Sequence, residues 1–325
     1  MVTGEQRPAS DDNPWPVLQY EQWRDTAVTL QLWTQMAGKV RLALSPWLNH
    51  GWQVPLYVHT RGLGTSPIHY RHGMLQIDFD FVDHRLLVST SEGSNRGFDL
   101  EPMSVAAFYR RFMAELGAAG VTVAINTMPS EVAAPIRFDD DEMHASYDRD
   151  AVRRFWRALQ QADRVFQLFR TSFLGKVSPV HFFWGGFDLA VTRFSGRKAP
   201  PHPGGIPGLP DAITREAYSH EVSSAGFWPG SESYPAAAFY SYAYPTPTGY
   251  QQADVQPAEA SWSTELSEWI LPYDAVRQAA DPDAALLSFL QSTYRAAARS
   301  AEWDPGLECE LGAPGRPRPV DTTGA

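Results

Sequence analysis

Helical spacing of apolar side chains marks four segments of the chain. Residues 19–36 place apolar side chains three or four positions apart, and Gly38 follows as a predicted helix stop. Ser104 is the predicted N-cap of a second helix, and Asp281, followed by proline, predicts the start of a last one. The longest pattern runs over residues 152–175 and predicts a helix that is buried along its length.

Segments rich in β-branched and aromatic residues predict antiparallel strands between these helices. The clearest one alternates apolar and polar residues over positions 77–81 and precedes a predicted turn at Asp83 and His84. Proline and glycine between residues 199 and 205 predict a loop. The predicted strands lie within residues 52–61, 75–91, 121–126, 180–194, 219–228 and 237–244.

These elements fall into two halves with the same order: a helix, antiparallel strands and a second helix. This order predicts an α+β fold in which helices cover the sheets. The predicted halves span residues 14–145 and 146–303, and the polar ends, residues 1–13 and 304–325, are predicted to be disordered tails.

Short similar runs in the two halves suggest an internal duplication. Gly38-Lys39-Val40 parallels Gly175-Lys176-Val177, and Trp52 precedes a Thr-Arg pair by the same separation as Trp184 does. A chance match between short runs is the alternative. If the duplication is real, a site near the junction of the halves is expected.

The charge of the chain narrows the classes of partner. The 325 residues include 27 Lys and Arg against 37 Asp and Glu, a formal net charge of -10. This balance argues against a nucleic acid or an anionic membrane as the main partner. No run of about 18 apolar residues occurs, so no membrane-spanning segment is expected. The single cysteine, Cys309, gives no disulfide framework and predicts a cytoplasmic location.

Aromatic residues make up 13% of the chain and include 11 Trp. Aromatic side chains bury large areas with few rotatable bonds, so they suit the walls of a ligand pocket. An aromatic-rich core explains the same composition, and both interpretations stay open.

Several familiar catalytic signatures are absent from the sequence. It contains no G-x-S-x-G nucleophile turn and no P-loop, and Gly62-Leu63-Gly64 lacks the third glycine of a dinucleotide site. His220-Glu221 begins like a zinc-protease motif, but Ser224 stands where the second histidine is required. Candidate chemistry therefore rests on dispersed polar residues.

One segment concentrates ionisable side chains in a largely apolar strand. His181, Asp188 and Arg193 lie within residues 181–193, where an isolated buried charge costs several kcal/mol. We expect His181 to be a catalytic acid/base group and Asp188 to orient one of the catalytic histidines. Arg193 is expected to hold an anionic group, and Trp184 to lie beside the substrate. The alternative is an Asp188–Arg193 ion pair with His181 bonded to a carbonyl group.

Three more residues complete the candidate site. His220 is the second expected acid/base group, because histidine titrates near neutral pH; a capping or hydrogen-bonding histidine is the alternative. Glu221 points to the other face of a strand, so it joins His220 in one site only at a bulge or strand end. His144 follows an acidic run that could supply ligands, although such a run before a helix commonly interacts with the helix dipole.

A metal centre and a cofactor are left open by the sequence. Two or three histidines with a carboxylate would suit iron, manganese or zinc. The available ligands come from separate segments with no compact spacing: His144, His181, His220, Asp188 and Glu221. The cofactor is therefore unknown at this stage.

Long runs of the sequence carry a family resemblance. The most specific run is HFFWGGFDLAVTRFSG at residues 181–196; further runs lie at 15–16, 33–35, 38–42, 144–148 and 218–224. In these runs the chain resembles the bacterial family called domain of unknown function 5996. Ala225 is a departure, because cysteine is expected there in many members, and this argues against thiol chemistry at that position. The resemblance implies no established activity, fold or catalytic assignment.

The sequence thus predicts a cytosolic enzyme that acts on a small polar or anionic metabolite through a His/carboxylate/Arg site in an aromatic-lined cavity. Its partner would be a small-molecule substrate or ligand, with no nucleic acid and no membrane; the oligomeric state is unknown. The alternative is a non-catalytic binding module or an interaction scaffold, neither of which needs a titrating pair.

Overall fold

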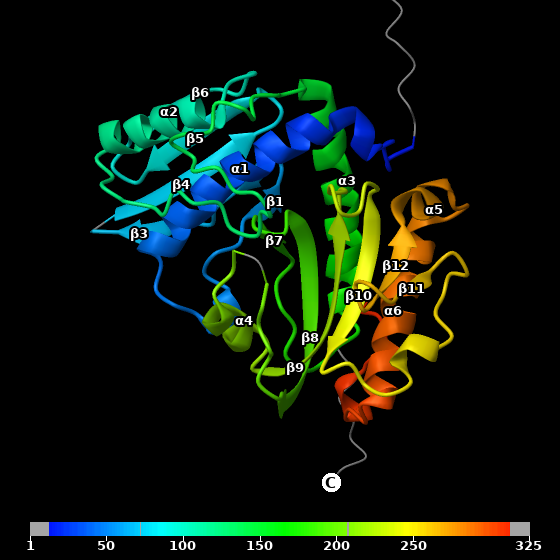
Figure 1. The fold of residues 1–325 in the computed structure, drawn as a ribbon. Helices are drawn as coiled ribbons and strands as arrows, with labels where there is room; N and C mark the ends of the chain where they lie inside the picture. Colours follow the sequence, from blue (N-terminus) through cyan, green and yellow to red (C-terminus); the bar gives the residue numbers. More distant parts are fainter. Residues whose placement is uncertain (1–12, 72, 207, 313–325) are drawn as a thin grey trace, which may run out of the picture.

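The computed structural model describes residues 13–71, 73–206 and 208–312, which form six α-helices and two six-stranded antiparallel sheets (Figure 1). The α+β class is therefore confirmed. Among the residues described, no helix combines the length and apolar character needed to cross a bilayer. Of the tails predicted at residues 1–13 and 304–325, residues 1–12 and 313–325 lie outside the described residues.

The first half consists of one sheet covered on one face by two helices. Helix α1 (Tyr20–Leu44) precedes the sheet, and α2 (Val105–Ala118) follows it, with Ser104 as its N-cap as predicted. The strands are β1 (Tyr57–His59), β2 (Gly62–Gly64), β3 (Ile68–Tyr70), β4 (Gly73–Asp80), β5 (Arg85–Thr90) and β6 (Asn95–Asp99). Their order is β1-β2-β4-β5-β6, with β3 also paired to β4. Alternate residues of β4, such as Ile77 and Phe79, are fully buried because they face the helices.

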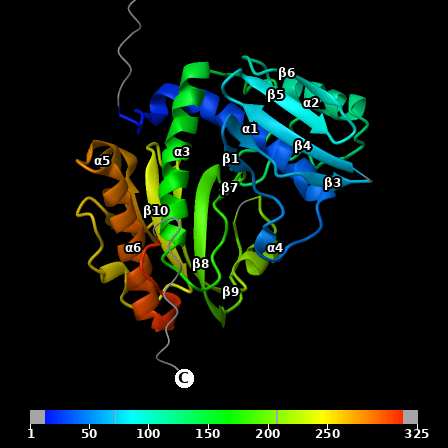
Figure 2. The ribbon, with the colours of Figure 1, turned by 180° about the vertical axis from the view of Figure 1, so that it is seen from behind.

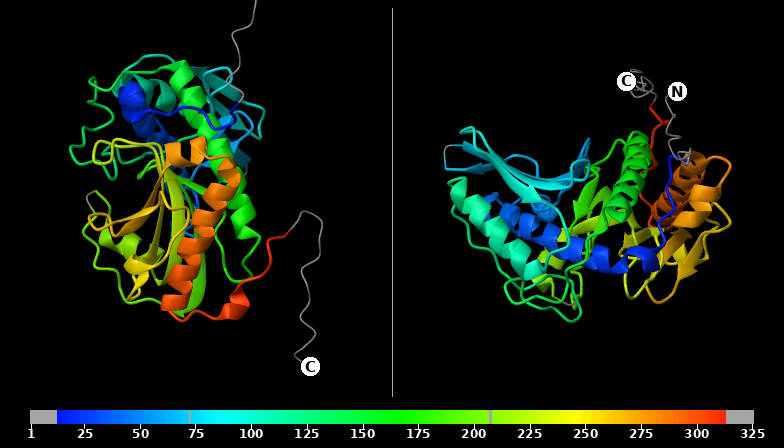
Figure 3. Two further views of the ribbon diagram at one scale, coloured as in Figure 1. Left: turned by 90° about the vertical axis from the view of Figure 1, so that its right-hand side faces the viewer. Right: turned by 90° about the horizontal axis from the view of Figure 1, so that it is seen from above.

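The second half repeats the order of helix, sheet and helix. Helix α3 (Arg149–Arg170) comes first, and α5 (Tyr273–Gln278) and α6 (Pro282–Ser300) come last. The sheet has the order β11-β12-β10-β9-β8-β7. Its strands are β7 (His181–Phe183), β8 (Asp188–Lys198), β9 (His220–Trp228), β10 (Ala238–Tyr244), β11 (Ser261–Ser263) and β12 (Glu268–Pro272). Helices α3, α5 and α6 contact one face of the sheet, whereas the short α4 (Asp211–Ala217) lies on the other side (Figures 1 and 3).

The two halves share one hydrophobic core. A single cluster of buried side chains runs from Trp15 to Trp303, and Leu56 of the first half forms backbone hydrogen bonds with Phe182 of the second. Figure 2 shows α3 beside the first sheet, seen from behind. The boundary predicted near residue 145 thus separates two halves that pack directly against each other.

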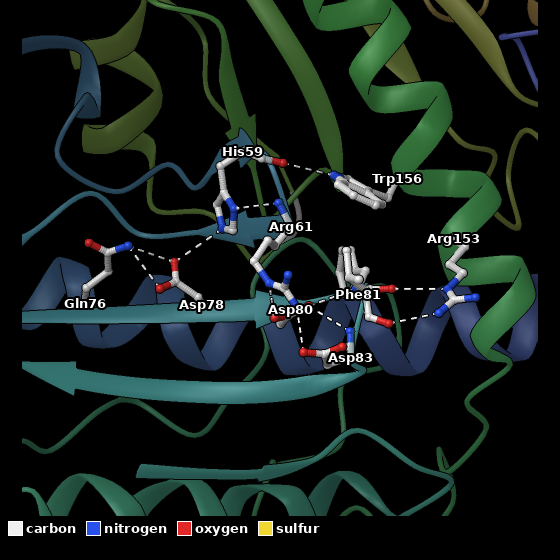
Figure 4. A network of polar contacts seen from close by, with 10 residues as sticks. His59, Arg61, Gln76, Asp78, Asp80, Phe81, Asp83, Arg153 and Trp156 are labelled. Carbon is white, nitrogen blue, oxygen red and sulfur yellow. Dashed lines mark hydrogen bonds and ion pairs between the residues drawn. The ribbon is translucent and has the colours of Figure 1, made fainter. Parts of the chain in front are cut away.

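Polar contacts also fasten α3 to the first sheet (Figure 4). Arg153 donates to the carbonyl oxygen of Val82 at 2.9 Å, and the indole of Trp156 donates to that of His59 at 3.2 Å. Nearby, Arg61 bridges Asp80 and Asp83, at 2.5 and 2.6 Å.

Some predicted boundaries were wrong. Helix α1 continues through Gly38 to Leu44, and α3 ends at Arg170 instead of continuing to 175. Residues 121–126 are not a strand. The predicted C-terminal tail begins too early, because the backbone of Leu307 and Cys309 bonds to Leu174 and Ser172.

The repeated order of elements fits the predicted duplication, which stays a prediction. The short matches do not occupy equivalent places in the two halves. Gly38 lies inside α1, whereas Gly175 follows the end of α3; Trp52 precedes β1, whereas Trp184 follows β7.

Candidate functional site

A cavity of about 470 Å³ lies on the face of the second sheet that α3, α5 and α6 leave uncovered. Three segments cover it: residues 47–54 around the short 3-10 turn η1 (Asn49–Gly51), the loop at Ser130 and Glu131, and residues 206 and 208–218 with α4. Its volume is in the range of small-molecule sites.

Alternation along the strands selects the residues that form the cavity floor. On β8, Asp188, Ala190, Thr192 and Phe194 line the cavity, whereas the intervening residues point to the helices. The same spacing brings in the other floor residues: Val222, Ser224 and Trp228 of β9, Tyr240 and Tyr242 of β10, and Glu268 of β12.

Asp188 is the most unusual group on this floor. It is buried, at 8% exposure, and accepts a hydrogen bond from the hydroxyl of Tyr240. Burial raises the pKa of Asp188 to about 7, while the bond from Tyr240 acts in the opposite direction. Its carboxyl group can therefore gain or lose a proton near neutral pH.

Gly226 makes the contact between Tyr240 and Asp188 possible. In the sheet register Gly226 lies between Tyr240 on β10 and Ala190 on β8. A Cβ atom at position 226 would stand 2.3 Å from the Tyr240 ring, so the ring passes over the glycine to reach β8.

Two further carboxyl groups line the same cavity. Burial raises the pKa of Glu268 to about 8, and its Oε2 is buried without a hydrogen-bond partner among the described residues. Glu131 is exposed to the cavity, yet the surrounding protein limits its contact with bulk water and raises the pKa of its carboxyl group. Glu131 and Asp188 both approach the backbone of Gly186, so the two carboxyl groups are neighbours.

A polar stripe on α1 positions the Glu131 side of the cavity. Gln31, Gln35 and Lys39 recur every four residues on this largely buried helix. The amide of Gln31 donates to the carbonyl oxygen of Gly185 at 2.7 Å, and Gln35 exchanges two bonds with the backbone of Ser130. The ammonium group of Lys39 donates to the carbonyl oxygen of Met128 at 2.8 Å; burial lowers its pKa to about 8.

Trp184 lies in the cavity wall. Its indole donates to the carbonyl oxygen of Val54 at 2.9 Å. The ring packs directly against α1 at Gly38, where a Cβ atom would lie 2.0 Å from the indole nitrogen. Glycine inside this helix thus leaves room for the ring.

The predicted pair of His181 and His220 is not assembled. His181 packs against Trp52 and Phe183, and within the described ranges neither of its ring nitrogens has a hydrogen-bond partner. Burial lowers the pKa of His181 to about 3, so the ring is neutral. His181 pairs with Ala190 of β8, which pairs in turn with Gly226 near the end of β9. His220 lies at the other end of β9, so the two histidines are far apart along the sheet. Neither histidine lines the cavity.

Arg193 faces the helices, on the opposite side of the sheet from the cavity. It is fully buried, with its guanidinium group 3.5 Å from the ring centre of Phe169 and 4.3 Å from that of Tyr294. It donates to Ser172 Oγ at 2.8 Å and to the carbonyl oxygen of Phe169. Burial lowers its pKa to about 9. The Asp188–Arg193 ion pair of the alternative interpretation does not form, and Arg193 is not placed to hold an anion in the cavity.

Glu221 and His144 also lie outside the cavity. Glu221 accepts hydrogen bonds from Ser195 and Arg197. His144 contacts Asp141 at 2.7 Å, in the loop before α3. In residues 13–312, apart from the two undescribed positions, no group of three or more His, Cys, Asp or Glu could hold a metal ion.

The family assignment follows from a match to a family model over residues 15–309, described as a family of unknown function, DUF5996. The chain belongs to the DUF5996 family. This match covers both halves, including every residue that lines the cavity. Comparisons with curated proteins and with solved structures find no match.

Several residues of the cavity and its walls were not among the site residues predicted from the sequence. Tyr240 and Tyr242 could have been found, because tyrosines alternate along β10. The stripe of Gln31, Gln35 and Lys39 was also visible at helical spacing. Glu131 had no such signal, because it comes from an irregular loop.

Proposed function

We propose that the protein binds a small polar molecule in this cavity and that Asp188 exchanges a proton with it. The observation that carries the proposal is a buried carboxyl group, held by Tyr240, in the wall of an aromatic cavity of about 470 Å³. Groups used for proton transfer work best when their pKa lies near the working pH, and the pKa of Asp188 is about 7.

The proposed function is still that of an enzyme acting on a small molecule, as predicted from the sequence, but a different set of residues forms its site. Asp188 and Trp184 remain, Tyr240 takes the place of the histidine pair, and Arg193 is left out. Glu268, whose pKa is about 8, provides a second carboxyl group that can carry a proton at pH 7.

A non-catalytic binding module is the second candidate. The neutral, fully packed His181 favours it, because the general base expected from the sequence does not reach the cavity. In that case the carboxyl groups would recognise the ligand without turnover. A cytoplasmic location also remains a proposal, supported by the single cysteine.

The proposal is tested with purified protein, a library of small polar metabolites and thermal unfolding. Compounds that raise the unfolding temperature are titrated by calorimetry between pH 5.5 and 8.5, in buffers with different ionisation enthalpies. We expect a bound compound whose proton uptake or release has a midpoint near pH 7. Asp188→Asn should abolish that proton exchange, whereas Asp254→Asn, at an exposed position, should preserve it.

Two results would contradict the proposal. One is a library without any stabilising compound; the other is proton exchange that persists unchanged in Asp188→Asn. Turnover of the bound compound, monitored by mass spectrometry, separates the enzyme from the binding module.

A further inference from the structure

We infer that the ligand of the cavity is an organic cation, an amine or quaternary ammonium group on a compact apolar body. This inference rests on the proposed small-molecule site and specifies the charge of its occupant. It is carried by the composition of the cavity wall: the described residues that line it include three carboxyl groups and aromatic rings on several sides, but no lysine or arginine.

The carboxyl groups lack a cation of their own inside the cavity. Asp188 is held by a neutral tyrosine, and Glu268 Oε2 has no hydrogen-bond partner in the part of the chain that the structure describes. Two lysines contact lining residues from behind and are engaged there: Lys39 with the carbonyl oxygen of Met128 and with Ser130 Oγ, and Lys176 with His50 Nε2 at 2.6 Å. A ligand that brings a positive charge would offset the cost of burying these carboxylates.

His50 does not reverse this charge balance. It lines the cavity, but burial and the neighbouring Lys176 lower its pKa, so the ring is neutral. Its Nδ1 lies 3.1 Å from the carbonyl oxygen of Ala217 and its Nε2 faces Lys176, which leaves both nitrogens engaged. A bound anion would therefore meet carboxyl groups with no compensating charge among the lining residues.

Aromatic rings in the cavity wall also favour a cationic ligand. The rings of Trp228 and Tyr240 lie 4.5 Å apart, and Tyr242 stacks beside Tyr240 at 6.1 Å. At the cover, Trp47 exposes 55% of its surface and lines the cavity. Such ring faces attract ammonium groups, most strongly where water is excluded, and they contact the apolar part of a ligand.

The test compares charged and uncharged ligands of the same shape. The probes are choline and its uncharged carbon isostere dimethylbutanol, benzylammonium and benzyl alcohol, and glucose as a neutral polyol. Affinities are measured by calorimetry at pH 8 with the full chain. We expect at least one cation to bind, with an affinity at least tenfold higher than that of its isostere.

Variants connect that preference to the cavity. Glu268→Gln and Glu131→Gln keep the side-chain shape and each remove a carboxyl group that can be negatively charged beside a bound cation, so each should lower the affinity for the cation about fivefold or more without changing that for the isostere. Glu265→Gln is the matched control, because Glu265 is exposed three positions before Glu268. Circular dichroism checks each fold, and two independent variants keep the test decisive if one does not fold.

The outcomes separate this inference from the proposal on which it rests. Equal affinity for cation and isostere, or binding of glucose alone, overturns the cation and leaves the small-molecule site intact. No binding of any probe also overturns the inference as stated; the metabolite library then decides on the site itself. Preference for the cation that survives in both glutamine variants places the cation outside this cavity and overturns the inference too.

Discussion

Gly38→Ala should destabilise the protein although it places a better helix former inside α1. Alanine in a helix interior is favoured over glycine by about 1 kcal/mol. At this position, however, the new methyl group would stand 2.0 Å from the indole nitrogen of Trp184, which must move. Forced repacking costs about 1–3 kcal/mol, and the hydrogen bond from Trp184 to Val54 contributes about 1 kcal/mol more. The net expectation is a loss of about 1–3 kcal/mol.

Gly117→Ala is the matched control for this substitution. Gly117 also lies in a helix, α2, but it is exposed and no other atom lies within 4 Å of a Cβ placed there. The control should therefore gain about 0.5–1 kcal/mol. Urea unfolding monitored by circular dichroism measures both variants, and their free energies of unfolding should differ by roughly 2–4 kcal/mol.

A double variant assigns the cost to the indole ring. Trp184→Phe introduces a smaller ring, so it should recover part of the loss in the Gly38→Ala background. The cavity wall moves with Trp184, so Gly38→Ala should also weaken any ligand found by the tests above. If Gly38→Ala and Gly117→Ala stabilise the protein equally, Trp184 does not pack on α1 and the described wall is incorrect.

Three other substitutions test the energetics of the site. Tyr240→Phe removes a bond that stabilises ionised Asp188, so the pKa of Asp188 should rise further and the pH midpoint of proton exchange should move upward; calorimetry in paired buffers measures it. Glu268 keeps its proton up to about pH 8 in the folded state, whereas the unfolded chain releases it near pH 4.5, so folding loses stability as pH rises through that window. Glu268→Gln removes that loss, so its free energy of unfolding should exceed that of the wild type by roughly 2–4 kcal/mol at pH 8 and by little at pH 4. Equal differences at both pH values would contradict the raised pKa of Glu268. His181→Leu should preserve ligand binding and raise the unfolding free energy by about 1–3 kcal/mol, because two unpartnered buried nitrogens are removed; lost binding in a folded variant would restore the histidine to the site.

The elements with local signals were predicted well. Asp281 caps α6 through the backbone NH of Ala284, and Ser104 caps α2, because capping depends on residues close in sequence. The turn at Asp83 and His84, between β4 and β5, was also predicted from residues close in sequence. Gly38 was misread as a stop, since the reason for a glycine there is the ring of Trp184, which is remote in sequence.

The site was predicted only in part because its members meet through sheet register. Asp188 and Trp184 stood out within one segment, but the partner of Asp188 is Tyr240, reached over Gly226 from a strand that is not adjacent. Arg193 looked functional because a buried charge is costly. Aromatic rings of α3 and α6 surround it on the other sheet face, which local sequence could not indicate.

The most direct test of the account is a carbon-13 NMR titration of the Asp188 carboxyl group, assigned by its loss in Asp188→Asn, with and without the cation that binds best. We predict that Asp188 titrates with a midpoint near pH 7 in the free protein, and with a midpoint at least one pH unit lower when the cation is bound. A midpoint near pH 4 that the cation does not move would contradict it.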